Sequence, residues 1–151
     1  MTTLHFFLVD DDADDIELFE EVLKEISPST VLTAAVNGKE ALQKLRTQET
    51  RRPDVLFLDL NMPLMGGKEC LKEIKADPHL QNLPVIMYTT SSHSKDIEET
   101  IISGALAFIT KPTGTKELKY ILSSLANGLR HDLQKTVRDL STNSTTFIVS
   151  S

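Results

Sequence analysis

The chain has 151 residues, a net charge of −6 and a hydrophobic content of 40%, as expected for one globular domain. No apolar stretch approaches the roughly 20 residues that span a bilayer, and the first residues lack the basic region of a secretory signal. The single cysteine, Cys70, excludes an internal disulfide framework. We therefore expect a cytoplasmic protein that does not enter a membrane.

The negative charge is concentrated in one part of the chain. Residues 10–25 hold nine acidic side chains and one basic side chain, Lys24. Binding of nucleic acid depends on Lys and Arg side chains that neutralise phosphates, whereas an acidic surface repels them. We expect no nucleic-acid partner.

Short apolar runs alternate with segments in which apolar residues recur at helical spacing, as Ile16, Phe19 and Leu23 do. This alternation predicts an α/β fold whose parallel sheet is covered by helices on both faces. The runs predict five strands, at His5–Val9, Val31–Val36, Asp54–Leu58, Pro84–Tyr88 and Ala107–Thr110.

Capping and breaking residues agree with the helical segments between these strands. Asn37, with a glutamate three residues later, is typical of a capping box at a helix start. Pro28 and Pro78 each follow a polar residue at which a helix is expected to end. Gly104 follows the fourth helical segment, where a left-handed residue commonly closes a helix.

The last helix is expected to begin near Thr115, and its apolar spacing continues to Leu140 despite Gly128. Either the helix continues past the glycine, or it ends there and a short amphipathic helix follows. Residues 141–151 are rich in Ser and Thr and show no useful period. We predict one domain over residues 1–127 and an extension over 128–151 that consists of this helical part and a polar tail.

Acidic residues directly follow two of the predicted strands. Asp10, Asp11 and Asp12 follow the first strand, and Asp59 ends the third apolar run. The carboxyl ends of neighbouring parallel strands meet in one crevice, where open α/β proteins bind ligands. Carboxylates gathered there repel one another unless a cation joins them, and a site made of oxygen atoms favours Mg²⁺ over Zn²⁺. The alternative is that these acids only cap helices.

Other polar residues follow the fourth and fifth strands. They are Thr89, Thr90 and Lys111. A metal ion and an ammonium can neutralise the oxygens of a phosphoryl group, and a hydroxyl can donate a hydrogen bond to one of them. An aspartate can itself attack phosphorus and form an aspartyl-phosphate. The pattern alone does not decide between Thr89 and Thr90.

Four motifs, in order and each at a strand end, resemble the receiver domain of two-component response regulators over about residues 4–127. They are Leu8-Val9-Asp10-Asp11-Asp12, Leu58-Asp59-Leu60-Asn61-Met62-Pro63 with Gly66, Tyr88-Thr89-Thr90, and Thr110-Lys111-Pro112. The resemblance implies a flavodoxin-like, doubly wound sheet of five parallel strands in the order 2-1-3-4-5.

The resemblance also implies a role for each strand-end residue. Asp59 would accept a phosphoryl group from a phosphohistidine on a sensor histidine kinase or a histidine phosphotransfer protein. Asp10 and Asp11 would organise Mg²⁺ together with Asp59, and the backbone carbonyl of Asn61 would complete its coordination. Thr89, rather than Thr90, and Lys111 would contact the phosphoryl oxygens.

Further implied roles concern switching and the lifetime of the phosphorylated state. Movement of Thr89 toward the phosphoryl group would let Phe108 turn inward, although Phe108 also fits a core residue that never moves. The residues at the positions that tune dephosphorylation are Asn61 and Ser91. Neither is an acid or a base that could align water, so we expect a moderate to long lifetime.

We expect a stand-alone receiver that signals to a downstream protein by contact or by phosphorelay and is not an enzyme. Residues 77–84 resemble the subgroup that includes partners of bacterial phytochromes. The segment 129–140 either extends a homodimer face or only covers the domain. The alternatives are a receiver-like binding module that never takes phosphate and, with Asp10 and Asp12 as its acids, an aspartyl-phosphate phosphatase.

Overall fold

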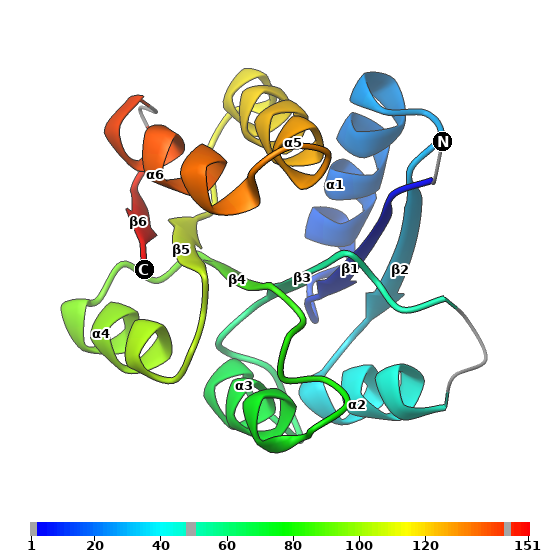
Figure 1. Ribbon diagram of the computed structural model, residues 1–151, viewed down its shortest axis with the longest axis vertical. Helices are drawn as coiled ribbons and strands as arrows, with labels where there is room; N and C mark the ends of the chain where they lie inside the picture. Colours follow the sequence, from blue (N-terminus) through cyan, green and yellow to red (C-terminus); the bar gives the residue numbers. More distant parts are fainter. Residues whose placement is uncertain (1–2, 48–50, 144–145) are drawn as a thin grey trace.

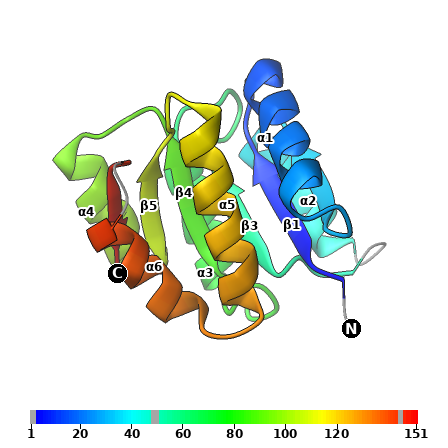
Figure 2. The same ribbon diagram turned by 90° about the horizontal axis from the view of Figure 1, so that it is seen from above.

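The computed structural model describes residues 3–47, 51–143 and 146–151. Within these residues a six-stranded sheet lies between two layers of helices (Figures 1 and 2). The strands are β1 (His5–Val9), β2 (Val31–Ala35), β3 (Val55–Leu58), β4 (Val85–Thr89), β5 (Ala107–Thr110) and β6 (Ile148–Ser150). The helices are α1 (Ala13–Ile26), α2 (Gly38–Arg46), α3 (Gly67–Ala76), α4 (Ser94–Ile102), α5 (Thr115–Leu129) and α6 (Leu133–Asn143).

The strand order is β2-β1-β3-β4-β5-β6, and the first five strands are parallel. Helices α1, α5 and α6 cover one face of the sheet, and α2, α3 and α4 cover the other (Figure 1). Every residue of β1, β3 and β4 is buried because both faces are covered. The predicted doubly wound order 2-1-3-4-5 is confirmed, and one further strand lies beyond it.

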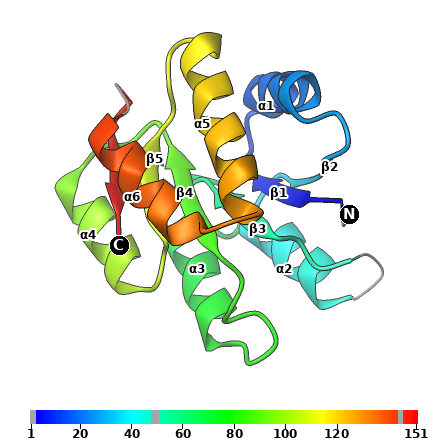
Figure 3. The same cartoon turned by 45° about the horizontal axis from the view of Figure 1, so that its top comes forward.

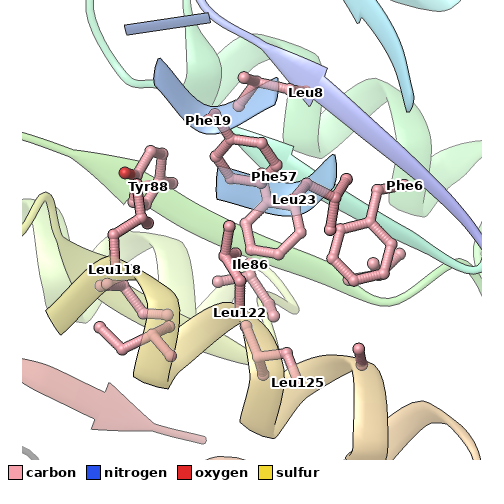
Figure 4. Close-up of a cluster of buried hydrophobic side chains, with 14 of the residues drawn as sticks. Phe6, Leu8, Phe19, Leu23, Phe57, Ile86, Tyr88, Leu118, Leu122 and Leu125 are labelled. Carbon is pink, nitrogen blue, oxygen red and sulfur yellow. The ribbon is translucent and has the colours of Figure 1, made fainter. Parts of the chain in front are cut away.

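An aromatic cluster joins α1 to the centre of the sheet (Figure 4). The ring of Phe57 lies 5.1 Å from that of Phe19 on α1 and 5.5 Å from that of Phe6 on β1, measured between centroids. Tyr88 on β4 lies 5.7 Å from Phe19 in an edge-on arrangement. These contacts hold the middle of α1 against β3 and β4, near the strand ends where the polar residues gather.

The helix ends follow the local signals. The Asn37 side chain accepts a hydrogen bond from the backbone N–H of Glu40 at 2.9 Å, as the capping pattern predicts. Ser27 is the C-cap of α1 and Asp77 that of α3, and each directly precedes a proline. Gly104 after α4 has a φ of 109°, which favours glycine.

The region after residue 127 departs from expectation. Helix α5 continues through Gly128 to Leu129, and a separate helix, α6, packs against it, with Val137 and Leu140 buried (Figure 3). A Cβ at Gly128 would lie 2.5 Å from Thr136 Oγ1, so the glycine permits the close approach of the two helices. The helix thus continues past the glycine, as one alternative predicts, and a second, short helix follows it, as the other predicts.

The segment expected as a polar tail contains a strand that its sequence did not indicate. Residues Ile148–Ser150 form β6, which pairs antiparallel with β5, Val149 lying opposite Phe108. The Thr110 N–H donates to the Phe147 carbonyl at 3.0 Å and extends this pairing toward the carboxyl end of β5. A strand of three residues is too short to show a period, and its Ser and Thr content hid it. The sheet consequently has a sixth strand, which covers the edge of β5.

Candidate functional site

The three predicted acidic residues meet at the carboxyl ends of β1 and β3. One carboxylate oxygen from each of Asp10, Asp11 and Asp59 lies within 4.8 Å of the other two. The adjacency of the strands causes this, because Val9 pairs with Leu58 and the Asp59 N–H donates to the Val9 carbonyl at 3.0 Å. Asp10 is fully buried, Asp59 as a whole residue is 8% exposed, and Asp11 faces solvent.

Lys111 brings its ammonium into the same crevice from the end of β5. Its Nζ lies 2.7 Å from Asp10 Oδ2, 2.7 Å from Asp15 Oδ2 and 3.7 Å from Asp59 Oδ2. Its backbone N–H donates to the Thr89 carbonyl at 2.7 Å, which fixes the start of the side chain beside β4. The ammonium is therefore shared by three carboxylates.

The buried Asp10 carboxylate is incompletely satisfied. Its Oδ1 accepts a hydrogen bond from the Asp12 N–H at 3.0 Å. Its Oδ2 lies within ion-pair distance of Lys111 but, among the described residues, receives no hydrogen bond of acceptable geometry. Burial raises the pKa of Asp10 to about 6, although the Lys111 ammonium opposes this and the Asp59 charge adds to it. An oxygen in this state is a ready ligand for a cation.

Lys111 stays charged despite its burial. Loss of hydration lowers the pKa of a buried ammonium, but here the Asp10 and Asp15 carboxylates outweigh that effect and raise the pKa of Lys111 above its usual value. The Tyr88 ring centroid lies 5.7 Å from Nζ and adds a weak attraction. The crevice thus holds a permanent positive charge beside its acids.

The acidic trio fits a hard divalent cation. All its donor atoms are carboxylate oxygens, which Mg²⁺, Mn²⁺ and Ca²⁺ prefer, and no histidine or thiol belongs to the group within the described residues. The close repulsion of Asp10 and Asp59 supplies the electrostatic reason to bind one. A divalent cation would replace Lys111 as the counter-charge of at least one of these carboxylates.

The backbone around Asp59 is tightly packed. The Leu60 N–H donates to Asp59 Oδ1 at 2.8 Å, and the Gly67 N–H donates to the Leu60 carbonyl at 2.8 Å. A Cβ at Gly67 would overlap the Asp59 carbonyl oxygen, so only glycine lets the start of α3 lie this close. The orientation of the Asp59 carboxylate is therefore set by its neighbours.

Thr89, the threonine favoured by the resemblance, is fully buried at the end of β4, whereas Thr90 is exposed. Asn61 is exposed at the rim, beside a cavity of about 310 Å³ that Asp96 also lines. Ser91 turns away toward α4, where its hydroxyl donates to Asp96 Oδ2 at 2.9 Å. Phe108 is fully buried on the side of the sheet that faces α3 and α4.

Two contacts at the site are not indicated by any local pattern in the sequence. Asp15 binds Lys111 from α1, 96 positions away in the chain. Asp96 is held by Lys68 on α3 at 2.6 Å as well as by Ser91, which ties the loop after β4 to α3. A run of acids on α1 gives no sign which of them faces β5, so no local signal could have singled out Asp15.

Residues 6–123 match the response regulator receiver domain family, and the chain belongs to this family. It is 34% identical over 115 residues to the response regulator Rcp1 of Synechocystis sp., with 74% of this chain and 78% of Rcp1 covered. Among longer curated relatives, the protein-glutamate methylesterase/protein-glutamine glutaminase of Bacillus subtilis is 38% identical over 119 residues, which cover only 31% of that protein.

Solved structures agree with the fold. The phosphorylated cyanobacterial phytochrome response regulator RcpA superposes with a TM-score of 0.79 at 31% identity, with 86% of this chain and 96% of RcpA covered. The Mn²⁺-bound form of Rcp1 superposes with a TM-score of 0.75 at 29% identity, with 85% of this chain and 96% of Rcp1 covered. The fold is that of response regulators of two-component systems.

No helix in the described part of the chain is both long enough and apolar enough to cross a membrane.

Proposed function

We propose that this receiver accepts a phosphoryl group on Asp59 from a phosphohistidine of a sensor histidine kinase or a histidine phosphotransfer protein. Mg²⁺ would be held by Asp10, Asp11, Asp59 and the backbone carbonyl of Asn61. The observation that supports the proposal best is the meeting of the three carboxylates near Lys111, whose ammonium lies 2.7 Å from Asp10 Oδ2. The Mn²⁺-bound structure of the relative Rcp1 agrees with a divalent cation.

Each side chain would have a defined part in the transfer. An Asp59 oxygen attacks phosphorus, so that the P–N bond to the donor histidine breaks as the O–P bond forms. Bound Mg²⁺ would supply neutralisation of the phosphoryl oxygens. Lys111 would hold a second phosphoryl oxygen by its ammonium, and the buried Thr89 hydroxyl, at the end of β4, would donate to a third.

Signalling would follow from movement of Thr89 and the loop after β4. Phosphorylation adds about two negative charges and three acceptor oxygens at one point. Phe108 is already fully buried and lies opposite Val149, which favours its role as a core residue. Its inward turn remains a prediction, as does the tuning of dephosphorylation by Asn61 and Ser91.

The partners belong to the same proposal. Because RcpA is a phytochrome response regulator, we propose a phytochrome-type sensor kinase as phosphoryl donor and a downstream protein as target, in the cytoplasm and without nucleic-acid contact. In this proposal the protein is a phosphoacceptor rather than an enzyme with its own substrate. Residues 128–151 are an extension whose helix α6 packs on α5 and whose strand β6 pairs with β5. Homodimer formation through residues 129–140 remains a prediction. The expectation of a stand-alone receiver also remains a prediction.

The competing phosphatase hypothesis gains no support from the geometry. It needs Asp10 as nucleophile and Asp12 as general acid, yet Asp10 is fully buried against Lys111. Asp12 instead caps α1, accepting from the N–H groups of Asp14 and Asp15 at 3.0 and 3.2 Å.

The proposal is tested by intact mass after brief incubation with acetyl phosphate and Mg²⁺, for the wild type and Asp59→Asn. We expect a single phosphoryl adduct on the wild type that requires Mg²⁺ and is absent from the variant. A folded wild type that never gains the adduct would instead support the phosphate-independent binding module.

A further inference from the structure

Asp15 is the one carboxylate that contacts Lys111 without belonging to the acidic trio, among the residues that the structure describes. It lies on the first turn of α1, and its side chain is 37% exposed, against 0% for Asp10 and 11% for Asp59. Its contact with Lys111 is also the one with hydrogen-bonding geometry, at 2.7 Å. Asp15 therefore offers the ammonium a partner that a metal ion would not use.

Both ends of this contact are fixed by the backbone. The N–H of Asp15 donates to the capping Asp12 side chain at 3.2 Å, which holds the first turn of α1. The N–H of Lys111 donates to the Thr89 carbonyl at 2.7 Å, and Pro112 restricts the backbone of Lys111 further. The contact therefore joins two segments whose backbones are already fixed, and it holds the ammonium toward α1.

Without Asp15, the carboxylates near the ammonium would be those of Asp10 and Asp59, as far as the described residues are concerned. Their Oδ2 atoms lie 2.7 and 3.7 Å from Nζ and belong to the carboxylates that would bind a divalent cation. The lysine and the cation would then compete for the same anions, and each bound cation would leave a buried ammonium unpaired.

We propose that Asp15 is a positioning residue that keeps Lys111 paired inside the site while a divalent cation takes over Asp10 and Asp59. The inference rests on the proposed function in one respect, that the trio holds Mg²⁺. Asp15 would thereby keep the ammonium from competing with the cation for the carboxylates of Asp10 and Asp59.

The test compares Mg²⁺ dissociation constants, measured by NMR titration of backbone amides, for the wild type, Asp15→Asn and Asp14→Asn. Asp14 is the matched control, because it lies one residue earlier on the same turn and is exposed. Both variants remove one charge from the acidic surface, but only Asp15→Asn removes the negative charge that is paired with Lys111. We expect Asp15→Asn to weaken Mg²⁺ binding about fivefold more than Asp14→Asn, which corresponds to about 1 kcal/mol.

A second pair of measurements separates positioning from simple loss of charge. In a Lys111→Met background, the two Asn variants should weaken Mg²⁺ binding equally, since no ammonium remains to be placed. The hydrogen-bonded ¹H–¹⁵Nζ signal of Lys111 should shift in Asp15→Asn and stay unchanged in Asp14→Asn. Thermal unfolding of each variant verifies that it is folded.

Each outcome decides a different question. A wild type that binds no Mg²⁺ refutes the proposed metal site itself. A wild type that binds Mg²⁺, with Asp15→Asn and Asp14→Asn alike, refutes only the role of Asp15. Persistence of the difference between them in the Lys111→Met background also refutes it, because the effect would then not pass through the lysine.

Discussion

The buried Asp10 should make the metal-free protein less stable at neutral pH than a variant in which this carboxyl cannot ionise. Burial raises the pKa of Asp10 from its usual 3.8 to about 6. Since one pKa unit corresponds to about 1.4 kcal/mol, ionised Asp10 costs the folded state about 3 kcal/mol. Asp10→Asn keeps the shape of the neutral acid and removes that cost.

The sign follows from proton binding. Because the folded state binds the Asp10 proton more tightly than the unfolded state does, the cost is absent below pH 3.8. It grows between pH 3.8 and about 6 and is complete above that range. At pH 7.5 we therefore expect Asp10→Asn to raise the free energy of unfolding by up to about 3 kcal/mol, and at pH 4 the gain should nearly vanish.

The assay is urea unfolding from pH 4 to 8 in the presence of EDTA, with the difference between variant and wild type as the measured quantity. This difference is needed because Asp77, Asp96 and Glu99 have lowered pKa values, through the His79 N–H for the first and Lys68 for the other two. Their stabilising contribution is lost as the pH falls, in both proteins alike.

Asp14→Asn serves as the control for net charge, since Asp14 is exposed and should change stability little at any pH. An Asp10→Asn variant less stable than the wild type at pH 7.5 would refute the reasoning. It would mean that the ion pair with Lys111, at 2.7 Å, outweighs the burial of the carboxylate. A gain that did not change with pH would refute the titration as its cause.

Three further substitutions test backbone strain and core packing by urea unfolding. Leu64→Gly should stabilise the protein by about 1 kcal/mol, because Leu64 has a φ of 67°, which is unfavourable for a residue with a side chain, and its side chain is 82% exposed. The residues on either side of Leu64 are hydrogen-bonded to each other in a tight turn. An unchanged midpoint of urea unfolding would exclude strain there. Leu140→Ala should cost about 2–4 kcal/mol, and a cost below about 0.5 kcal/mol would show that α6 is not part of the core. Gly67→Ala should cost about 1–3 kcal/mol and weaken Mg²⁺ binding, because its Cβ would overlap the Asp59 carbonyl; full Mg²⁺ affinity would contradict that packing.

The sequence by itself determined the layered fold and the identity of the acids. A strand that is buried on both faces is a continuous apolar run, so it can be recognised in the sequence without knowledge of its neighbours, as Val55–Leu58 can. Helix ends are local as well, and Asn37 caps as its spacing predicts. Residues that directly follow neighbouring parallel strands lie at one edge of the sheet, so the meeting of Asp10 with Asp59 could be predicted from the sequence.

Only the tertiary structure decided what depends on how distant segments pack. The contact between Asp15 and Lys111 joins the first turn of α1 to the end of β5, and the rotation of α1 on the sheet selects Asp15 from a run of acids. Strand β6 exists because β5 offers it an unpaired edge, since Ile148–Ser150 is too short to show a period. Local patterns specify elements, but the charge that each acid faces is set by packing between elements far apart in the chain.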